Sequence, residues 1–435
     1  MRSAPVSVSA RLRPLARPLA ATLARALAPF AALAVGLAPA ASAPAGPARP
    51  SPEALAERVL ASVPLVDGHN DWPWAMRTHF GLEKAREADL SADPGVRRPQ
   101  PGHTSIPLLR AGRVGAQLWS LYVPMRLRGE EAVRTSFEQL ELVRHWVARH
   151  PETFALVTTA DELERAFRRG RIASLLAFEG AHQVDDDILT LRRAHAAGLR
   201  AMTLTHSQPS ALFDSATAEA RHGGMAPAGR AMIAEMNRLG VLVDLSHVSP
   251  AVMHQVLDIA AAPVIFSHSS ARAVTDHPRN VPDDVLKRLP ANGGVVMVTF
   301  VPAFVSQARA DWETRRQAQR LVAGQGAEAE ARMAAWEKAN PRPVATLAMV
   351  ADHIEHVARV AGHDHVGIGG DYDGVPDLPQ GLETVATYPA LFAELARRGW
   401  SEANLRKLAG GNFLRVLRAN EATARRLAAA RPAPR

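Results

Sequence analysis

Short apolar runs alternate with amphipathic stretches along most of this 435-residue chain, and this alternation restricts the fold more than any other feature. The apolar runs lie at 63–69, 114–123, 172–179, 200–206, 241–247, 263–268, 294–300 and 365–371. Amphipathic stretches separate them, for example at 130–149, 184–197, 226–239, 250–260 and 344–361. Nearly continuous apolar strands between helices are typical of parallel strands that are buried on both faces.

Eight such units predict a (β/α)8 barrel of the TIM type, preceded by a helix at 52–61. A doubly wound open sheet is the alternative, but no phosphate-binding glycine fingerprint follows the first apolar run. Two stretches are not part of the eight strand–helix units. The polar stretch 77–112 is expected to form loops that lie as a lid or rim over the site, and residues 302–343 predict a protruding helical insertion after the seventh strand.

The first 43 residues have the features of a targeting segment. They carry five arginines and no acidic residue, and an alanine-rich apolar part leads to an Ala-x-Ala pattern that ends at Ala43. We therefore expect a signal peptide at 1–43 and an exported protein, periplasmic or secreted, without stable membrane insertion after cleavage; an uncleaved anchor is the alternative. A disordered spacer, the barrel and a C-terminal tail are then predicted at 44–52, 53–420 and 421–435.

The composition excludes several classes of function and site. Five of the eight net positive charges belong to the targeting segment, so the remainder is too weakly basic to indicate nucleic-acid binding. The chain has no cysteine, which excludes disulfide bonds and thiolate metal ligands.

Polar residues stand where the predicted strands end. His69 and Asp71 are two residues apart, so both side chains can face one point beyond their strand. In a (β/α)8 barrel the carboxyl ends of the strands converge on the active-site face. A lone histidine there is more often structural, but crowded histidines and acids need a cation or protons to hold them together. The other strand ends carry Glu179, His206, His247, His268 and Asp371.

The candidate metal ligands outnumber those of a single catalytic zinc ion, which takes about three from the protein. They are suited to two metal ions about 3.5–4 Å apart that share a carboxylate and a hydroxide. Glu179 is expected to be the bridging carboxylate, but spacing alone leaves the division of the other ligands open. The candidates are His69, Asp71, Glu179, His247 and His268.

With these motifs taken together, the chain resembles the membrane (renal) dipeptidase family of zinc metallopeptidases, which have amidohydrolase-type barrels. The motifs run in the family's order, and the resemblance covers about residues 55–420. The matching stretches are Asp67-Gly68-His69-Asn70-Asp71, Glu179-Gly180, Leu204-Thr205-His206-Ser207, Asp244-Leu245-Ser246-His247, Ser267-His268-Ser269-Ser270, Arg279-Asn280-Val281-Pro282-Asp283-Asp284 and Gly369-Gly370-Asp371-Tyr372-Asp373-Gly374.

The resemblance implies two Zn²⁺ ions per chain, for which Co²⁺ or Mn²⁺ could substitute because these metals share such ligands. It implies small dipeptides as substrates and suggests a homodimer. One zinc would be held by His69, Asp71 and Glu179. The other would be held by Glu179, His247 and His268.

The resemblance also implies roles for three further residues. His206 would contact the scissile carbonyl oxygen, Arg279 would bind the substrate's terminal carboxylate, and Asp371 would transfer the proton. A metal-bridging hydroxide would attack the peptide bond, since metals lower the pKa of bound water to about 7. The planar fork of Arg279 matches a carboxylate, and its fixed distance from the metals would select dipeptides.

Several neighbouring residues are expected to support the site. Asp67 and Asp244 would orient metal ligands, Trp72 and Trp74 would pack at the rim, and Tyr122 could line the pocket. The chain departs from the family at Val301, where a tyrosine follows the phenylalanine of the seventh strand in the animal enzymes, which are also disulfide-linked. The resemblance therefore does not specify which side chains of the dipeptide substrate this chain prefers.

Two other functions compete with a dipeptidase. One is a related metal-dependent amide or lactam hydrolase that acts on N-acyl amino acids or β-lactams and need not use Arg279. The other is a metal-holding binding protein without activity, although every expected ligand and catalytic residue is present.

Overall fold

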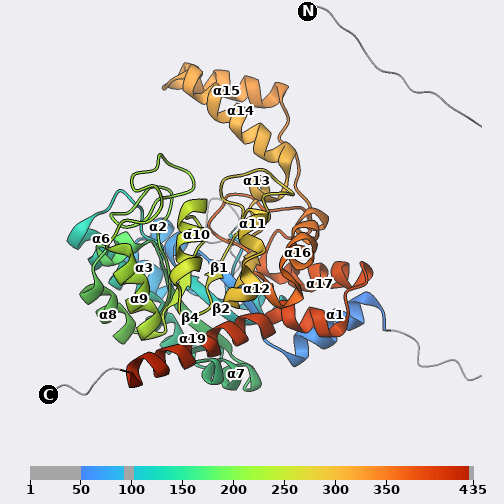
Figure 1. Cartoon of the computed structure of the whole chain (residues 1–435). Helices are drawn as coiled ribbons and strands as arrows, with labels where there is room; N and C mark the ends of the chain where they lie inside the picture. The colour runs from blue at the N-terminus through green and yellow to red at the C-terminus, as the bar shows by residue number, and fades with distance from the viewer. Residues whose placement is uncertain (1–49, 93–101, 431–435) are drawn as a thin grey trace, which may run out of the picture. The chain divides into compact units, whose positions relative to one another are not determined.

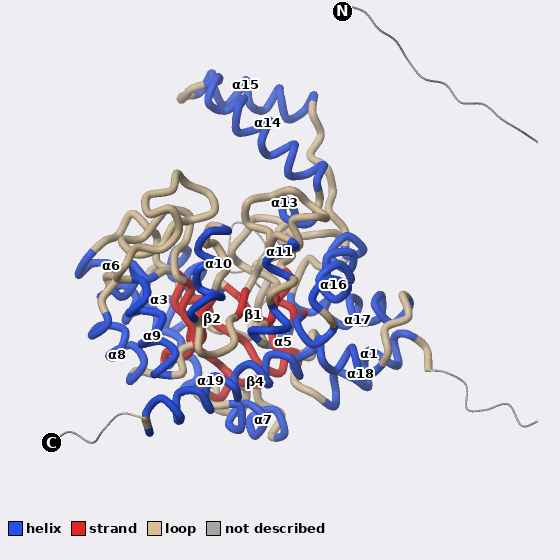
Figure 2. Tube along the Cα trace, viewed as in Figure 1, coloured by secondary structure: helices blue, strands red, loops and turns tan. Residues whose placement is uncertain are grey.

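Eight parallel strands close into a barrel surrounded by helices, as the sequence predicts (Figure 2). The computed structural model describes residues 50–92 and 102–430. The predicted signal peptide and most of the predicted spacer lie outside the described residues. Within them, no helix is long and apolar enough to cross a membrane.

The ring of strands closes because β2 pairs with both β1 and β4, while β1 also pairs with β9. The other neighbours follow the chain order. The barrel strands are β1 (Leu65–Asn70), β2 (Val114–Ser120), β4 (Ile172–Glu179), β5 (Leu199–Thr203), β6 (Leu242–Asp244), β7 (Ile265–Phe266), β8 (Val295–Val298) and β9 (Val366–Ile368).

Each predicted strand region overlaps one barrel strand, but several strands end earlier than predicted. The run 241–247 contains β6 only as far as Asp244, and 365–371 contains β9 only as far as Ile368. The backbone φ is +71° at His247 and +62° at Asp371, which is incompatible with an extended strand. One further short strand, β3 (Phe154–Leu156), was not predicted and pairs with the start of β4.

Helices pack around the barrel, and the predicted amphipathic stretches all contain one. The first helix is α1 (Pro52–Ser62), whose N-cap Ser51 accepts a hydrogen bond from Ala54 N at 3.2 Å. The remaining outer helices are α6 (Gly129–Arg149), α7 (Ala160–Arg168), α8 (Ile188–Ala196), α9 (Gly229–Leu239), α10 (Pro250–Ile259), α11 (Asp283–Leu286), α12 (Leu289–Asn292), α16 (Leu347–Ala361), α17 (Tyr388–Arg397), α18 (Glu402–Arg406) and α19 (Asn412–Ala429).

Two expectations about the chain's organisation need correction. The stretch 77–112, expected to form loops, includes the end of α2 (Trp72–Phe80), α3 (Leu82–Glu87) and α5 (Ile106–Ala111) in its described part. Local capping explains the helix at α5, because Ser105 accepts a hydrogen bond from Leu108 N. The predicted tail begins inside α19, which continues to Ala429 with Asn420 and Thr423 buried.

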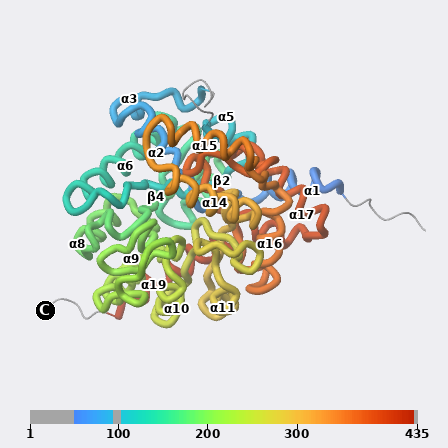
Figure 3. The backbone as a smooth tube through the Cα atoms, turned by 90° about the horizontal axis from the view of Figure 1, so that it is seen from above, coloured from blue at the N-terminus to red at the C-terminus, as the bar shows by residue number. Residues whose placement is uncertain are grey.

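The helical insertion after β8 is present as predicted. It consists of α13 (Pro302–Val305), α14 (Gln307–Ala323) and α15 (Ala327–Ala339). The α14–α15 hairpin extends beyond the other helices (Figure 1), and in the view from above it overlaps the rest of the barrel (Figure 3). The two long helices contact through Trp312 and Trp336, whose ring centroids lie 5.7 Å apart. In the first turn of α14, Arg309 donates two 3.0 Å hydrogen bonds to Asp377.

Two adjacent glycines in the π-helical turn before α19 test how closely this turn packs on the barrel. A Cβ at Gly410 would lie 2.2 Å from Pro64 O and 2.8 Å from Val66 Cγ2. At Gly411 its nearest neighbour would be Arg406 O at 3.2 Å. We expect Gly410→Ala to lower the free energy of unfolding by about 1–3 kcal/mol through overpacking. Gly411→Ala should change it by less than about 1 kcal/mol, and urea denaturation that gives equal losses would contradict this packing.

Candidate metal centre

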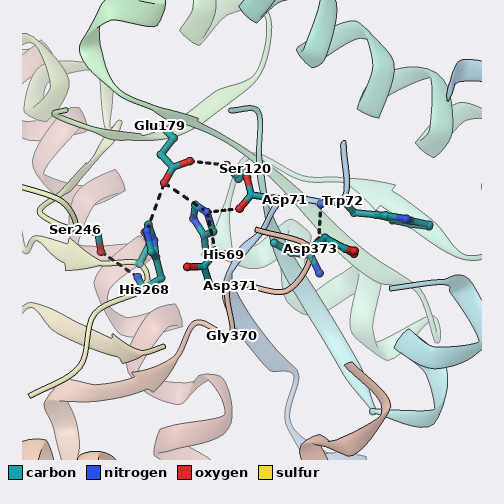
Figure 4. A network of polar contacts seen from close by, with 12 residues as sticks. His69, Asp71, Trp72, Ser120, Glu179, Ser246, His268, Gly370, Asp371 and Asp373 are labelled. Carbon is teal, nitrogen blue, oxygen red and sulfur yellow. Dashed lines mark hydrogen bonds and ion pairs between the residues drawn. The ribbon is translucent and has the colours of Figure 1, made fainter. Parts of the chain in front are cut away.

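The carboxyl ends of the barrel strands bring all the predicted catalytic and metal-binding side chains into one cluster. Figure 4 shows His69, Asp71, Glu179, His268 and Asp371 of this cluster. Short strands and immediate turns put each residue at the same end of the barrel. His69 lies in β1 and Asp71 directly after it, Glu179 ends β4, and His206, His247, His268 and Asp371 follow β5, β6, β7 and β9.

One oxygen of Glu179 is the centre of this cluster. Its Oε1 lies 3.0 Å from His247 Nε2 and 3.4 Å from His268 Nε2. The Nε2 atoms of His69 and His206 lie 3.6 Å and 3.7 Å from the same oxygen. The side chain is buried, so one carboxylate oxygen is shared by four imidazoles away from bulk water.

The two aspartates lie on the β1 and β9 side of the cluster. His69 Nε2 is 3.1 Å from Asp71 Oδ2 and 3.9 Å from Asp371 Oδ1. A Cβ at Gly374 would lie 2.4 Å from Asp71 Oδ2 and 2.3 Å from Asp371 Oδ1, so a side chain there would displace these carboxylates. The backbone fixes the same pair, because Asp371 N donates to His69 O and Asp71 N donates to Tyr372 O.

Two members of the cluster have backbone conformations that non-glycine residues rarely adopt. These are His247 and Asp371, at φ +71° and +62°. Such conformations cost free energy and persist where the surrounding structure enforces them, which occurs most often at functional sites. The strain therefore supports a functional role for both side chains.

Burial and mutual charge shift the pKa values of the cluster strongly. Burial alone would lower the pKa of His69, but the carboxylates of Glu179 and Asp71 raise it to about 10. Burial raises the pKa of Glu179 to about 8 and that of Asp371 to about 6. Burial lowers the pKa of His247 well below its ordinary value. Carboxylates this close require added positive charge, which either protons or a cation can supply.

The donor set is appropriate for divalent metal ions. His247 Nε2 and His268 Nε2 lie only 2.8 Å apart, so at least one of these two nitrogens is unprotonated. An unprotonated imidazole nitrogen can bind a metal ion. Asp71 Oδ1 is buried and has no hydrogen-bond partner among the described residues. Nitrogen and carboxylate ligands without thiolates match zinc and the metals that resemble it.

The clustered atoms overlap with the predicted division into two metal sites but do not reproduce it. Sets of ligand atoms that all lie within 4.8 Å of one another combine Glu179 with His69 and His268, and Glu179 with His206 and His247. A further set joins His69 with the two aspartates. The ligands of each of the two ions therefore stay a prediction.

Asp244 lies behind the cluster and orients His268, as expected of a residue that supports a metal ligand. Its Oδ2 accepts hydrogen bonds from Thr203 Oγ1 and Ser267 Oγ, both at 2.6 Å. The Ser267 hydroxyl proton is therefore directed to the carboxylate, and its oxygen accepts from His268 Nδ1 at 2.8 Å. This arrangement leaves Nε2 of His268 as the free ligand atom.

Asp67 supports the opposite side of the cluster in a similar way. Its Oδ1 accepts hydrogen bonds from His69 N at 3.2 Å and from Gly370 N at 2.8 Å. The carboxylate thereby ties β1 to the loop that carries Asp371.

A cavity of about 340 Å³ opens beside the cluster, and side chains outside the cluster form its walls. Trp74 and Tyr122 line it as predicted, but Trp72 is buried against Trp119 and Trp146 instead. Two wall residues were not predicted, Phe304 and Val375. No motif lies beside Phe304, whereas Val375 directly follows the Gly369–Gly374 motif, which could have indicated it. The walls comprise Trp74, Tyr122, Arg279, Val301, Phe304 and Val375.

The sequence matches the model of a known family over most of its length. Residues 53–431 match the membrane dipeptidase family, peptidase family M19. An uncharacterised dipeptidase of Schizosaccharomyces pombe is 39% identical over 386 residues, covering 85% of this chain and 84% of the relative. Dipeptidase verJ of Clonostachys rogersoniana is 38% identical over 371 residues, covering 83% and 85%.

A solved structure resembles the barrel at moderate sequence identity. The metallopeptidase of Rhodobacter sphaeroides, solved with a phosphinate mimic of the dipeptide L-Ala-D-Ala, is 26% identical with a TM-score of 0.66. The match covers 82% of this chain and 99% of that chain.

Replacing Asp244 tests whether the residues behind the cluster control metal binding. We expect Asp244→Asn to weaken metal affinity about 10- to 100-fold, because an amide N–H₂ would face the Thr203 and Ser267 donors and disturb His268. Competition with a chromogenic chelator measures the affinity. Asp214→Asn is the matched control, because Asp214 also accepts several backbone hydrogen bonds but belongs to a loop outside the cluster. Equal losses of affinity in the two variants would contradict a specific role.

Proposed function

The chain belongs to the membrane dipeptidase family of metallopeptidases, and from that premise we propose that it is an exported dipeptidase that works with two zinc ions. The single observation that carries the proposal is the shared Glu179 oxygen, which lies 3.0–3.7 Å from four imidazole nitrogens inside a cavity that also contains Arg279. A carboxylate in this position is suited to bridging two cations.

In this proposal, five residues hold the metal ions and Glu179 is shared between them. The ligands would be His69, Asp71, Glu179, His247 and His268. When bound, zinc would supply a hydroxide nucleophile near neutral pH and an electrophile for the carbonyl oxygen.

The proposal gives Asp371 and His206 the proton and oxygen contacts of the reaction. Burial raises the pKa of Asp371 to about 6, so its carboxylate can take up a proton near neutral pH and return it to the leaving amine. Burial lowers the pKa of His206 to about 3, so the ring is neutral and has one N–H group. That group can donate to the oxygen that becomes negative in the transition state.

Arg279 is proposed to select substrates with a free carboxylate. Its guanidinium is almost fully buried in the cavity, and it has no ion pair with a carboxylate among the described residues. Burial lowers the pKa of Arg279 to about 10, which still leaves it charged at neutral pH. A buried cation of this kind gains most from an anionic ligand with matching planar geometry.

Export and dimer formation are further parts of the proposal. Export rests on the sequence of residues 1–43 and would be tested by N-terminal sequencing, which should find a mature chain that begins at Pro44. A homodimer rests on the family resemblance alone, and sedimentation of the purified chain would test it.

Removal of metal should abolish the activity of the purified protein. We expect about two equivalents of zinc per chain and hydrolysis of a dipeptide panel, with activity lost on chelation and restored by Zn²⁺, Co²⁺ or Mn²⁺. Metal analysis and amine release from the dipeptides measure both quantities. One equivalent of metal, or activity that persists after chelation, would refute the dinuclear proposal.

Truncation of Arg279 separates a dipeptidase from a general amide or lactam hydrolase. We expect Arg279→Ala to lower kcat/KM for dipeptides about 100-fold or more, because the substrate carboxylate loses a buried charge-assisted partner. Turnover of C-terminally amidated dipeptides should change little. Arg272→Ala is the control for distortion of the same loop, since Arg272 holds the carbonyls of His277 and Pro278. Unchanged dipeptide turnover in Arg279→Ala would favour the alternative hydrolase.

A further inference from the structure

Hydrogen bonds hold the buried guanidinium of Arg279 only weakly. Nη1 donates to Ser269 Oγ and Nη2 donates to His268 O, both at 3.4 Å. These distances exceed the usual 2.7–3.2 Å for N–H···O bonds, so neither contact fixes the guanidinium plane firmly. A fork that must meet a carboxylate in one geometry needs an additional constraint.

The ring of Phe304 supplies a contact of the required kind. The Cζ atom of Arg279 lies over this ring, 5.3 Å from its centroid, within the range of about 6 Å for a cation–π interaction. Phe304 lies in α13 and lines the same cavity as Arg279. An aromatic face over Cζ restrains the plane and leaves N–H groups available to a carboxylate.

The structure also fixes Phe304 itself relative to the Arg279 loop. The Phe304 and His277 rings stack with centroids 4.3 Å apart and an interplanar angle of 30°. Asn280 Nδ2 donates to Phe304 O at 2.8 Å and to Thr275 O at 2.9 Å. Side-chain and backbone contacts therefore join α13 to the loop in which Arg279 lies.

We propose that Phe304 is a positioning residue, which orients the Arg279 guanidinium for the terminal carboxylate of the dipeptide. The inference rests on the proposed function, because that function supplies the carboxylate. Phe304 acts through Arg279 and not on the reacting atoms. Its loss should therefore weaken binding of substrates with a free carboxylate and leave the chemical step largely intact.

Two substitutions at this position test the inference. Phe304→Leu keeps apolar volume but removes the aromatic face, and we expect KM for dipeptides to rise about tenfold with kcat within about twofold. Phe304→Tyr keeps the face, and its KM should stay within about twofold of wild type. For amidated dipeptides, Phe304→Leu should change kcat/KM by less than about twofold, because these substrates lack the carboxylate.

The chain contains a matched control for loss of a cation–π pair elsewhere. Arg193 Cζ lies 5.8 Å from the centroid of the Phe137 ring on α6, away from the cavity. Phe137→Leu should leave KM for both substrate types unchanged. Losses in Phe304→Leu that are equal for free and amidated dipeptides, or a KM equal to wild type, would overturn the positioning role.

A binding measurement distinguishes failure of this inference from failure of the proposed function. Calorimetry with zinc-loaded protein would compare a phosphinate dipeptide mimic with its C-terminal amide. If wild type prefers the free acid and Phe304→Leu loses that preference, the inference holds even without turnover. If wild type prefers the acid and the variant does too, only the inference fails. If wild type neither hydrolyses dipeptides nor prefers the acid, both fail.

Discussion

Four imidazole nitrogens lie around one carboxylate oxygen of Glu179. Much of the surrounding structure holds these side chains in place. Positive charge must balance the buried carboxylates, and the free imidazole nitrogens offer places for metal ions to supply it. The barrel makes this cluster possible because its strands bring side chains from distant parts of the sequence to one end. Asp67 then holds the backbone at His69 and Gly370, and Asp244 orients the His268 ring through Ser267.

The strands end where the site begins. β6 and β9 stop three residues before His247 and Asp371, and both residues have positive φ values. The backbone thereby turns these side chains into the cluster, at a conformational cost that regular strands would avoid. Gly374 completes the arrangement, since any side chain there would collide with the carboxylates of Asp71 and Asp371.

The residues proposed to recognise the substrate and those proposed to bind metal come from different parts of the same barrel face. The cluster is built on strand ends, whereas Arg279 lies in a loop after β7 and contacts Phe304 in the short helix α13. α13 also begins the helical insertion, so the segment that departs most from a bare barrel contributes directly to the cavity wall. Loops on a rigid scaffold commonly carry specificity in this way.

The sequence by itself determined the barrel and the candidate residues at the carboxyl ends of its strands, because each signal is local: a nearly continuous apolar run followed by histidine or carboxylate. It could not identify Phe304 as a cavity residue or Trp72 as a core residue, since their roles depend on neighbours far away in the chain. Helices within 77–112 were also missed because their caps and tertiary contacts outweigh a polar composition. Only the tertiary structure decided that four histidines share one Glu179 oxygen, because distances between strand ends depend on barrel closure, which no local pattern encodes.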